Sequence, residues 1–211
     1  MAATGSTGLC EAGRVRRFRP ARLLLLLAGC VVLGLGVGLL LIADLGSDGY
    51  STLVNGIARS GDWEFVVVNI AVSAVFLAVA AGRGVLPGIG TLVQIVVVGY
   101  TVTLMLDHLD TPDSDVTRAL LLVVAIPVLS IGIAAYLGSQ LGAGPVEAAA
   151  LAWDPPVPFR WSYSALQAVG AIAGWLLGAA IGPGTIVVIF MLGPLVDRTA
   201  RLMRLDVHQT R

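Results

Sequence analysis

One acidic residue, Glu147, occupies a place in the sequence where a carboxyl group could do chemistry inside an otherwise apolar chain. It follows Gly144-Pro145 by two residues, in the first turn of a short predicted helix, where the helix dipole favours a carboxylate. If Glu147 faces the bundle interior, it is a proton or cation site, because an ionisable group at bilayer depth costs about 2.5–3.5 kcal/mol on insertion scales. If it lies at the surface, it only caps the helix. The sequence leaves both interpretations open.

Four further polar residues could form a substrate-binding site together with Glu147. Asn69 and Gln167 are amides at matching places in two apolar segments, Gln94 lies in a third, and Asp48 belongs to a turn that corresponds to the one before Glu147. The competing interpretation is that these amides only form hydrogen bonds between helices, worth about 0.6–2 kcal/mol each. We expect no catalytic residue, metal site or cofactor, because no nucleophile–base pair, metal-ligand set or phosphate-binding loop is visible.

Composition predicts the elements that position these residues. Hydrophobic residues form 57% of the 211-residue chain and charged residues 12%, whereas a soluble domain is roughly 25% charged. The formal net charge is zero, so nucleic-acid binding is not indicated. About 20 apolar residues cross a bilayer as a helix. We therefore expect an all-α, polytopic membrane protein that contacts the lipid bilayer, with six transmembrane helices over residues 23–43, 63–81, 91–106, 118–140, 161–181 and 185–196.

The first of these segments also contains Leu27-Ala28-Gly29-Cys30, which has the form of a bacterial lipobox. The apolar stretch before Cys30 is short for a signal peptide, and the apolar run continues well beyond it. We therefore expect an uncleaved span rather than a lipoprotein leader, with Gly34 and Gly38 forming a face for close helix packing.

An internal repeat organises the chain. Gly90-Thr91, seven mostly apolar residues and Gly99 match Gly184-Thr185, seven such residues and Gly193. Upstream, two predicted helix breaks also match, the first containing Gly46 and Gly49 and the second containing Gly142, Gly144 and Pro145. The two threonines are expected to cap their helices.

Three spans per repeat force the second repeat to enter the membrane from the opposite side, which predicts an inverted-topology repeat. With the N-terminus in the cytoplasm, eleven arginines lie inside, and only Arg59 and Arg118 lie outside, as the positive-inside rule requires. The predicted organisation is a basic tail (1–22), a first repeat (23–108), an acidic external loop (109–117), a second repeat (118–205) and a tail (206–211), with both termini in the cytoplasm of a bacterial inner membrane.

The segments Gly142-Ala143-Gly144-Pro145-Val146-Glu147 and Gly184-Thr185 through Gly193-Pro194-Leu195-Val196-Asp197 resemble the YczE/YyaS/YitT-type family of bacterial membrane proteins. The resemblance covers about residues 23–205. It implies a polytopic inner-membrane protein of mostly undefined activity, loosely grouped among exporters. The first repeat departs from the family pattern, since Gly49 replaces the usual Pro and Ser51 a common acid.

Two functions fit these observations. One is a small secondary transporter or exporter of unknown substrate, in which Glu147 faces a central cavity with Asn69 or Gln167 and exchanges a proton, desolvation raising its pKa. The alternative is a non-transporting scaffold or regulatory protein that acts through membrane partners. A cavity lined by Asn69, Gln167 and Glu147 would favour transport, and a tightly packed glycine-rich interface without a cavity would favour the scaffold. Either function is compatible with a homo-oligomer.

Overall fold

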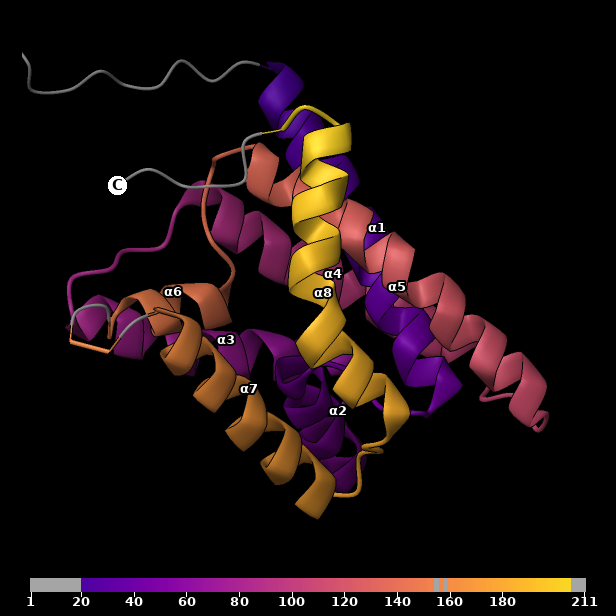
Figure 1. The fold of residues 1–211 in the computed structure, drawn as a ribbon. Helices are drawn as coiled ribbons and strands as arrows, with labels where there is room; N and C mark the ends of the chain where they lie inside the picture. The colour runs from indigo at the N-terminus through magenta and orange to yellow at the C-terminus, as the bar shows by residue number, and fades with distance from the viewer. Residues whose placement is uncertain (1–19, 154–155, 158, 206–211) are drawn as a thin grey trace, which may run out of the picture.

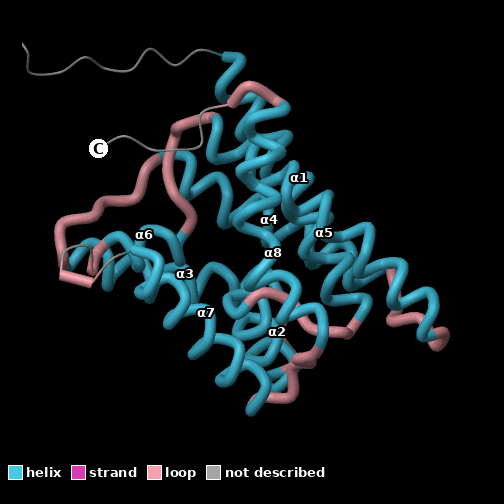
Figure 2. The backbone as a smooth tube through the Cα atoms, in the orientation of Figure 1, coloured by secondary structure: helices cyan, strands magenta, loops and turns pink. Residues whose placement is uncertain are grey.

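The computed structural model describes residues 20–153, 156–157 and 159–205, and within them all regular structure is helical (Figure 2). The described chain forms eight helices, so the predicted all-α class is confirmed. They are α1 (Pro20–Ala43), α2 (Gly49–Gly61), α3 (Phe65–Gly82), α4 (Ile89–His108), α5 (Asp115–Gly138), α6 (Pro145–Leu151), α7 (Phe159–Leu176) and α8 (Pro183–Leu202). The predicted tails 1–22 and 206–211 lie outside these residues, apart from Pro20, Ala21 and Arg22.

Four helices, α1, α3, α4 and α5, are long and apolar enough to cross a membrane, as expected of an integral membrane protein. Among the described residues α8 contributes a shorter apolar stretch, Pro183–Leu192, and α7 is not among the four. The expected fifth span, 161–181, is too long at its C-terminal end: α7 stops at Leu176 because Gly178 turns the backbone into the left-handed region at φ +91°.

The outer surface of the bundle is apolar. Phe190 and Met191 on α8 are more than half exposed, as are Val75 and Leu104 on other helices. Monomeric soluble proteins rarely expose large contiguous apolar surface to water. Lipid is the medium that these faces fit.

Helices α1 and α5 lie side by side along one edge of the molecule in Figure 1 and form the most extensive helix–helix contact of the described chain. A Cβ added at Gly36 would lie 2.9 Å from the backbone nitrogen of Leu129, and one added at Gly132 would lie 2.5 Å from that of Leu33. At one end of the pair, the Arg118 side chain donates to the carbonyl oxygen of Ala43 at 2.8 Å. The start of α5 thus meets the end of α1, so the two helices are antiparallel.

The packing of the other helices is matched between the two halves. Helix α1 packs on α4 as α5 packs on α8, and α2 packs on α7 as α6 packs on α3. Likewise α2 contacts α3 as α6 contacts α7. The start of α1 and the end of α8 lie at the same end of the molecule (Figure 1).

The helix breaks join the halves by reciprocal hydrogen bonds. The Gly184 N–H donates to the carbonyl oxygen of Leu45 at 2.9 Å, and the Gly90 N–H donates to that of Leu141 at 3.0 Å. Each bond connects the start of one half's last helix with the break of the other half. Gly46 has φ +97° and contacts Thr185 at this junction, which explains why glycine is needed there.

The two threonines of the repeated motif do not cap their helices, contrary to expectation. Gly88 and Gly182 occupy the N-cap positions of α4 and α8. Thr91 instead donates its hydroxyl to the carbonyl oxygen of Ala143, 2.6 Å away in the opposite half. The Thr185 hydroxyl is buried and has no hydrogen-bond partner within the described chain.

The short helices α2 and α6 are internal elements. Five of the seven residues of α6 are buried, and Gly49 at the start of α2 lies against the backbone of Gln167 in α7. In α1, Gly34 and Gly38 lie against Thr101 and Met105 of α4, so the predicted glycine face is used for close packing. Cys30 is fully buried within the continuous helix α1.

Candidate functional site

A cavity of about 80 Å³ lies in the middle of the bundle. Every one of the eight described helices contributes to its wall. An engineered cavity of about 150 Å³ is known to hold one benzene molecule, so this cavity has room for a few heavy atoms or several waters. It is lined by Leu33, Val37, Asp48, Tyr50, Ser51, Phe65, Asn69, Gln94, Ile95, Val98, Leu129, Ile133, Tyr136, Pro145, Val146, Glu147, Tyr163, Gln167 and Leu192.

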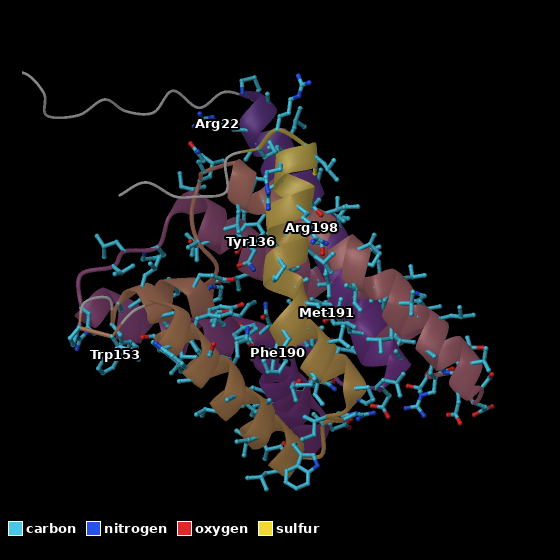
Figure 3. The ribbon with its side chains drawn as sticks, viewed as in Figure 1. Arg22, Tyr136, Trp153, Phe190, Met191 and Arg198 are labelled. Carbon is cyan, nitrogen blue, oxygen red and sulfur yellow. The ribbon has the colours of Figure 1, made fainter. Side chains whose placement is uncertain are left out.

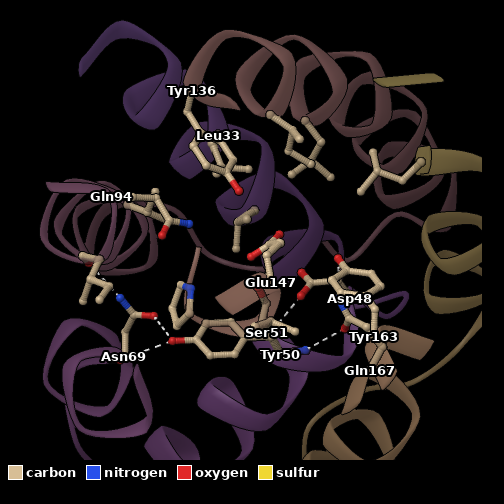
Figure 4. A pocket seen from close by; sticks show the side chains of 18 of the residues that line it. Leu33, Asp48, Tyr50, Ser51, Asn69, Gln94, Tyr136, Glu147, Tyr163 and Gln167 are labelled. Carbon is tan, nitrogen blue, oxygen red and sulfur yellow. Dashed lines mark hydrogen bonds between the residues drawn. The ribbon is translucent and has the colours of Figure 1, made fainter. Parts of the chain in front are cut away.

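All five residues that the sequence suggested for substrate binding line this one cavity (Figure 4). They come from five different elements: Asp48 before α2, Asn69 in α3, Gln94 in α4, Glu147 in α6 and Gln167 in α7. Burial confirms the expectation for the two matched amides, with Asn69 3% and Gln167 7% exposed. The predicted break motifs bring these elements together, because the breaks lie at the starts of α2 and α6.

Tyr50 connects the amides and was missed by sequence reasoning. Its hydroxyl donates to Asn69 Oδ1 at 2.8 Å and lies 2.7 Å from Ser73 Oγ, while its backbone N–H donates to Gln167 Oε1 at 3.0 Å. Asn69 also donates to the carbonyl oxygen of Ile95 at 2.8 Å. Both amides therefore form the interhelical hydrogen bonds of the competing interpretation, and they hold Tyr50 rigidly at the cavity wall.

Glu147 faces the cavity and not the molecular surface (Figure 4). It stands at the third position of α6, and the carboxyl group of Asp48 lies near it on the same wall. One Asp48 oxygen accepts from the Ser51 N–H at 3.0 Å and thereby caps α2. Both acids lie outside the four candidate spans. Burial raises the pKa of each above its ordinary value, and the nearby Asp48 carboxylate raises the pKa of Glu147 further.

Two buried polar atoms at the cavity make no hydrogen bond within the described part of the chain: the Tyr136 hydroxyl and Gln94 Oε1. Tyr136 is only 2% exposed, and its hydroxyl points into the cavity toward Glu147 (Figure 4). Buried polar groups are nearly always paired with protein, water or ligand. These two atoms therefore mark the cavity as a place for a polar occupant.

The cavity lies where the two halves meet, and its lining residues form equivalent pairs along the repeat. Leu33 pairs with Leu129, and Asn69 pairs with Gln167. At other equivalent positions the side chains differ, as Ser51 and Glu147 do. Similar backbones thus present different chemistry from the two sides, and the cavity is asymmetric.

A second hollow, of about 310 Å³, adjoins the ends of α2 and α4 and is strongly acidic. Phe65 lines both this vestibule and the central cavity and is 3% exposed. The vestibule is lined by Leu41, Ile42, Asn55, Ala58, Arg59, Asp62, Trp63, Glu64, Phe65, Thr103, Leu106, Asp107, Leu109, Asp110 and Thr111. No group of three or more His, Cys, Asp or Glu side chains that could hold a metal ion occurs among the described residues.

Comparison with known proteins gives a family but no activity. An uncharacterised protein of Haemophilus influenzae is 26% identical over 175 residues, which cover 82% of this chain and 80% of that protein. No solved structure matches the chain. The model of a family of unknown function, DUF6198, matches residues 20–201, which include all eight helices but the last residue of α8. The chain therefore belongs to the DUF6198 family.

Proposed function

We propose that this membrane protein is a small secondary transporter whose substrate occupies the central cavity. The observation that carries the proposal is that Glu147, Asp48, Asn69, Gln94 and Gln167 line one cavity between the two halves. In transporters built from inverted repeats, the substrate site lies at the repeat interface near broken helices. The cavity has this position, next to the breaks before α2 and α6.

The matched contacts support an inverted repeat. If a two-fold axis relates the halves and residue i of the first half contacts residue j of the second, the equivalents of i and j also contact each other, as in a symmetric dimer. The pairs Gly36–Leu129 and Leu33–Gly132 follow this rule at the centre of the bundle. Because α1 and α5 are antiparallel, the axis would lie in the membrane plane, and α7 and α8 would complete six spans.

The arginine distribution supports an orientation with both termini in the cytoplasm. Arg22 and Arg198 belong to the two helices whose outer ends share one end of the molecule (Figures 1 and 3). The acidic vestibule then opens to the outside, because it includes Asp107 and Asp110 at the external end of α4. The proposed setting is the inner membrane of a bacterium.

Phe65 and Glu147 have distinct roles in the proposed cycle. Phe65 separates the vestibule from the cavity, so a rotation of its ring would open the outward route. Glu147 would release a proton when the substrate arrives and regain one when it leaves. The titratable groups that face it across the cavity are Asp48, Tyr50, Tyr136 and Tyr163.

The scaffold alternative is less favoured. Glycines do pack α1 tightly on α5, as a scaffold would require, but a polar cavity also lies between the halves. Two carboxyl groups and two unpaired polar atoms in that cavity would only weaken a protein whose function is structural. The resemblance to the YczE/YyaS/YitT-type family, with its loose grouping among exporters, points the same way.

Everted membrane vesicles from cells that make the protein test this proposal even though the substrate is unidentified. The vesicles are incubated with a small-molecule extract of the parent cells, and their contents are compared by mass spectrometry. Vesicles with the intact protein should accumulate or lose at least one compound relative to vesicles with Glu147→Gln at equal abundance. Identical contents in both sets, under an imposed pH gradient, would contradict transport.

A further inference from the structure

We infer that the central cavity binds a compact organic cation that carries several N–H donors. Only the further step, that this cation is the transported substrate, rests on the proposed function. Binding of the cation can be tested separately. Four independent features support it: the charge of the cavity, its unpaired atoms, the vestibule beside it and its size.

The cavity holds two acidic side chains and no basic side chain among the described residues that line it. Asp48 and Glu147 contribute two carboxyl groups, and no arginine or histidine is among the described residues that line it. The remaining polar lining consists of amides and hydroxyls. An anion would face both carboxylates, whereas a cation would make charge-assisted hydrogen bonds with them. The cavity therefore selects positive charge.

The hydrogen-bonding groups that remain unused favour an N–H donor. The Oε1 atom of Gln94 is an acceptor with no partner within the described chain, while the amide oxygens of Asn69 and Gln167 already accept from Tyr50. The oxygen of Tyr136 is likewise unpaired. A cation with several N–H groups would satisfy Gln94 and both carboxylates at once. Ca²⁺ and Mg²⁺ prefer six or more oxygen ligands, and no group of three or more His, Cys, Asp or Glu side chains that could hold a metal ion occurs among the described residues.

The vestibule would concentrate cations next to this cavity. Asp62, Glu64, Asp107 and Asp110 line it, against the single base Arg59. The Arg59 guanidinium lies 3.5 Å from a carboxylate oxygen of Asp44, which offsets part of its charge. An acidic cleft raises the local concentration of cations and lowers that of anions. Phe65 then separates the concentrated cation from its site.

Size limits the cation to a few heavy atoms, because the cavity measures about 80 Å³. The three tyrosines at its wall, Tyr50, Tyr136 and Tyr163, add aromatic surface, which favours organic cations over strongly hydrated inorganic ones. Guanidinium satisfies the size, the charge and the donor requirement. Urea has nearly the same planar shape without the charge, so the two molecules form a matched pair of probes.

Isothermal titration calorimetry on the full chain in mild detergent tests the inference. Guanidinium at millimolar concentration should bind saturably with one site per chain, and urea should not. Glu147→Gln and Asp48→Asn should each weaken guanidinium binding by about 10- to 100-fold, the range expected for a lost charge-assisted hydrogen bond. Asn retains the capping function of Asp48, and Asp113→Asn, in the exposed external loop, serves as the control that should bind normally.

Equal binding of urea and guanidinium, no binding of guanidinium, or unchanged binding in both variants would overturn the inference. The first two results need no variant, so a folding defect cannot obscure them. Flux of guanidinium into liposomes separates this inference from the proposed function. Saturable binding without flux would contradict transport and leave the cation site standing. Glu147-dependent flux of an anion or neutral compound, without guanidinium binding, would contradict the cation site and leave the transport proposal standing.

Discussion

Replacing Gly132 by Ala tests the close crossing of α1 and α5, on which the whole arrangement depends. The added Cβ would lie 2.5 Å from the backbone nitrogen of Leu33, whereas carbon contacts are normally about 3.5–4.0 Å. The clash is with backbone, so a side-chain rotation cannot relieve it. Overpacking costs about 3 kcal/mol at the upper end of its range, and Ala recovers about 1 kcal/mol of helix propensity over Gly. We expect a net loss of about 2 kcal/mol in the free energy of unfolding.

Equilibrium unfolding in mixed detergent and SDS micelles, followed by circular dichroism, measures this loss. Gly82→Ala is the matched control, because a Cβ there meets nothing within 4 Å and adds only helix propensity. Gly36→Ala should destabilise the fold as well, since its Cβ would approach the backbone of Leu129. If Gly132→Ala is as stable as Gly82→Ala, the helices do not approach as described and the reasoning is refuted.

Three further predictions concern stability. Thr91→Val should lower the free energy of unfolding by about 1–2 kcal/mol through loss of its hydrogen bond, whereas Thr185→Val should be neutral or stabilising; equal effects would contradict the pairing. Arg118→Ala should lower the free energy of unfolding by about 1.5–3 kcal/mol, because the guanidinium donates to carbonyl oxygens at the end of α1. A loss below about 0.5 kcal/mol, which is usual for a surface substitution, would argue against that role. The pKa of Glu147 is raised in the folded chain above its ordinary 4.5, so the folded state binds more protons than the unfolded state does. The free energy of unfolding should therefore fall as pH rises from about 4.5 through the raised pKa. The fall should be smaller in Glu147→Gln.

Long-range hydrophobic patterning made most of the fold predictable. The apolar runs correspond to α1, α3, α4 and α5, and the Gly-Pro break before Glu147 correctly indicated a short helix at Pro145. The repeat also predicted which polar residues would be equivalent. Asn69 and Gln167, which the repeat matches to each other, both line the central cavity.

Contacts between the halves could not be predicted in the same way. Thr91 looked like a helix cap because local sequence shows only its own helix, whereas its hydroxyl bonds to Ala143 in the other half. Tyr50 and Tyr136 were missed since a tyrosine in an apolar segment is usually a core or interface residue. A tyrosine hydroxyl indicates a polar site only when the fold places it beside a carboxyl group, as the fold places Tyr136 beside Glu147 (Figure 4). The one available signal for Tyr50 was its position next to Gly49 in the repeated break.

Access to the cavity from both sides of the membrane is the most direct test of the transport proposal, and it can be measured with the substrate still unidentified. Ser51 lines the cavity and is small enough to be replaced by Cys, in a chain where Cys10 and Cys30 are changed to Ser and Ala. A membrane-impermeant thiol reagent is applied to right-side-out and to everted vesicles, with Asp113→Cys as the control for an always external position. The proposal predicts labelling of Ser51→Cys from both sides, and labelling of the control only from outside. Labelling of Ser51→Cys from one side alone, or from neither, would contradict a carrier that alternates around this cavity.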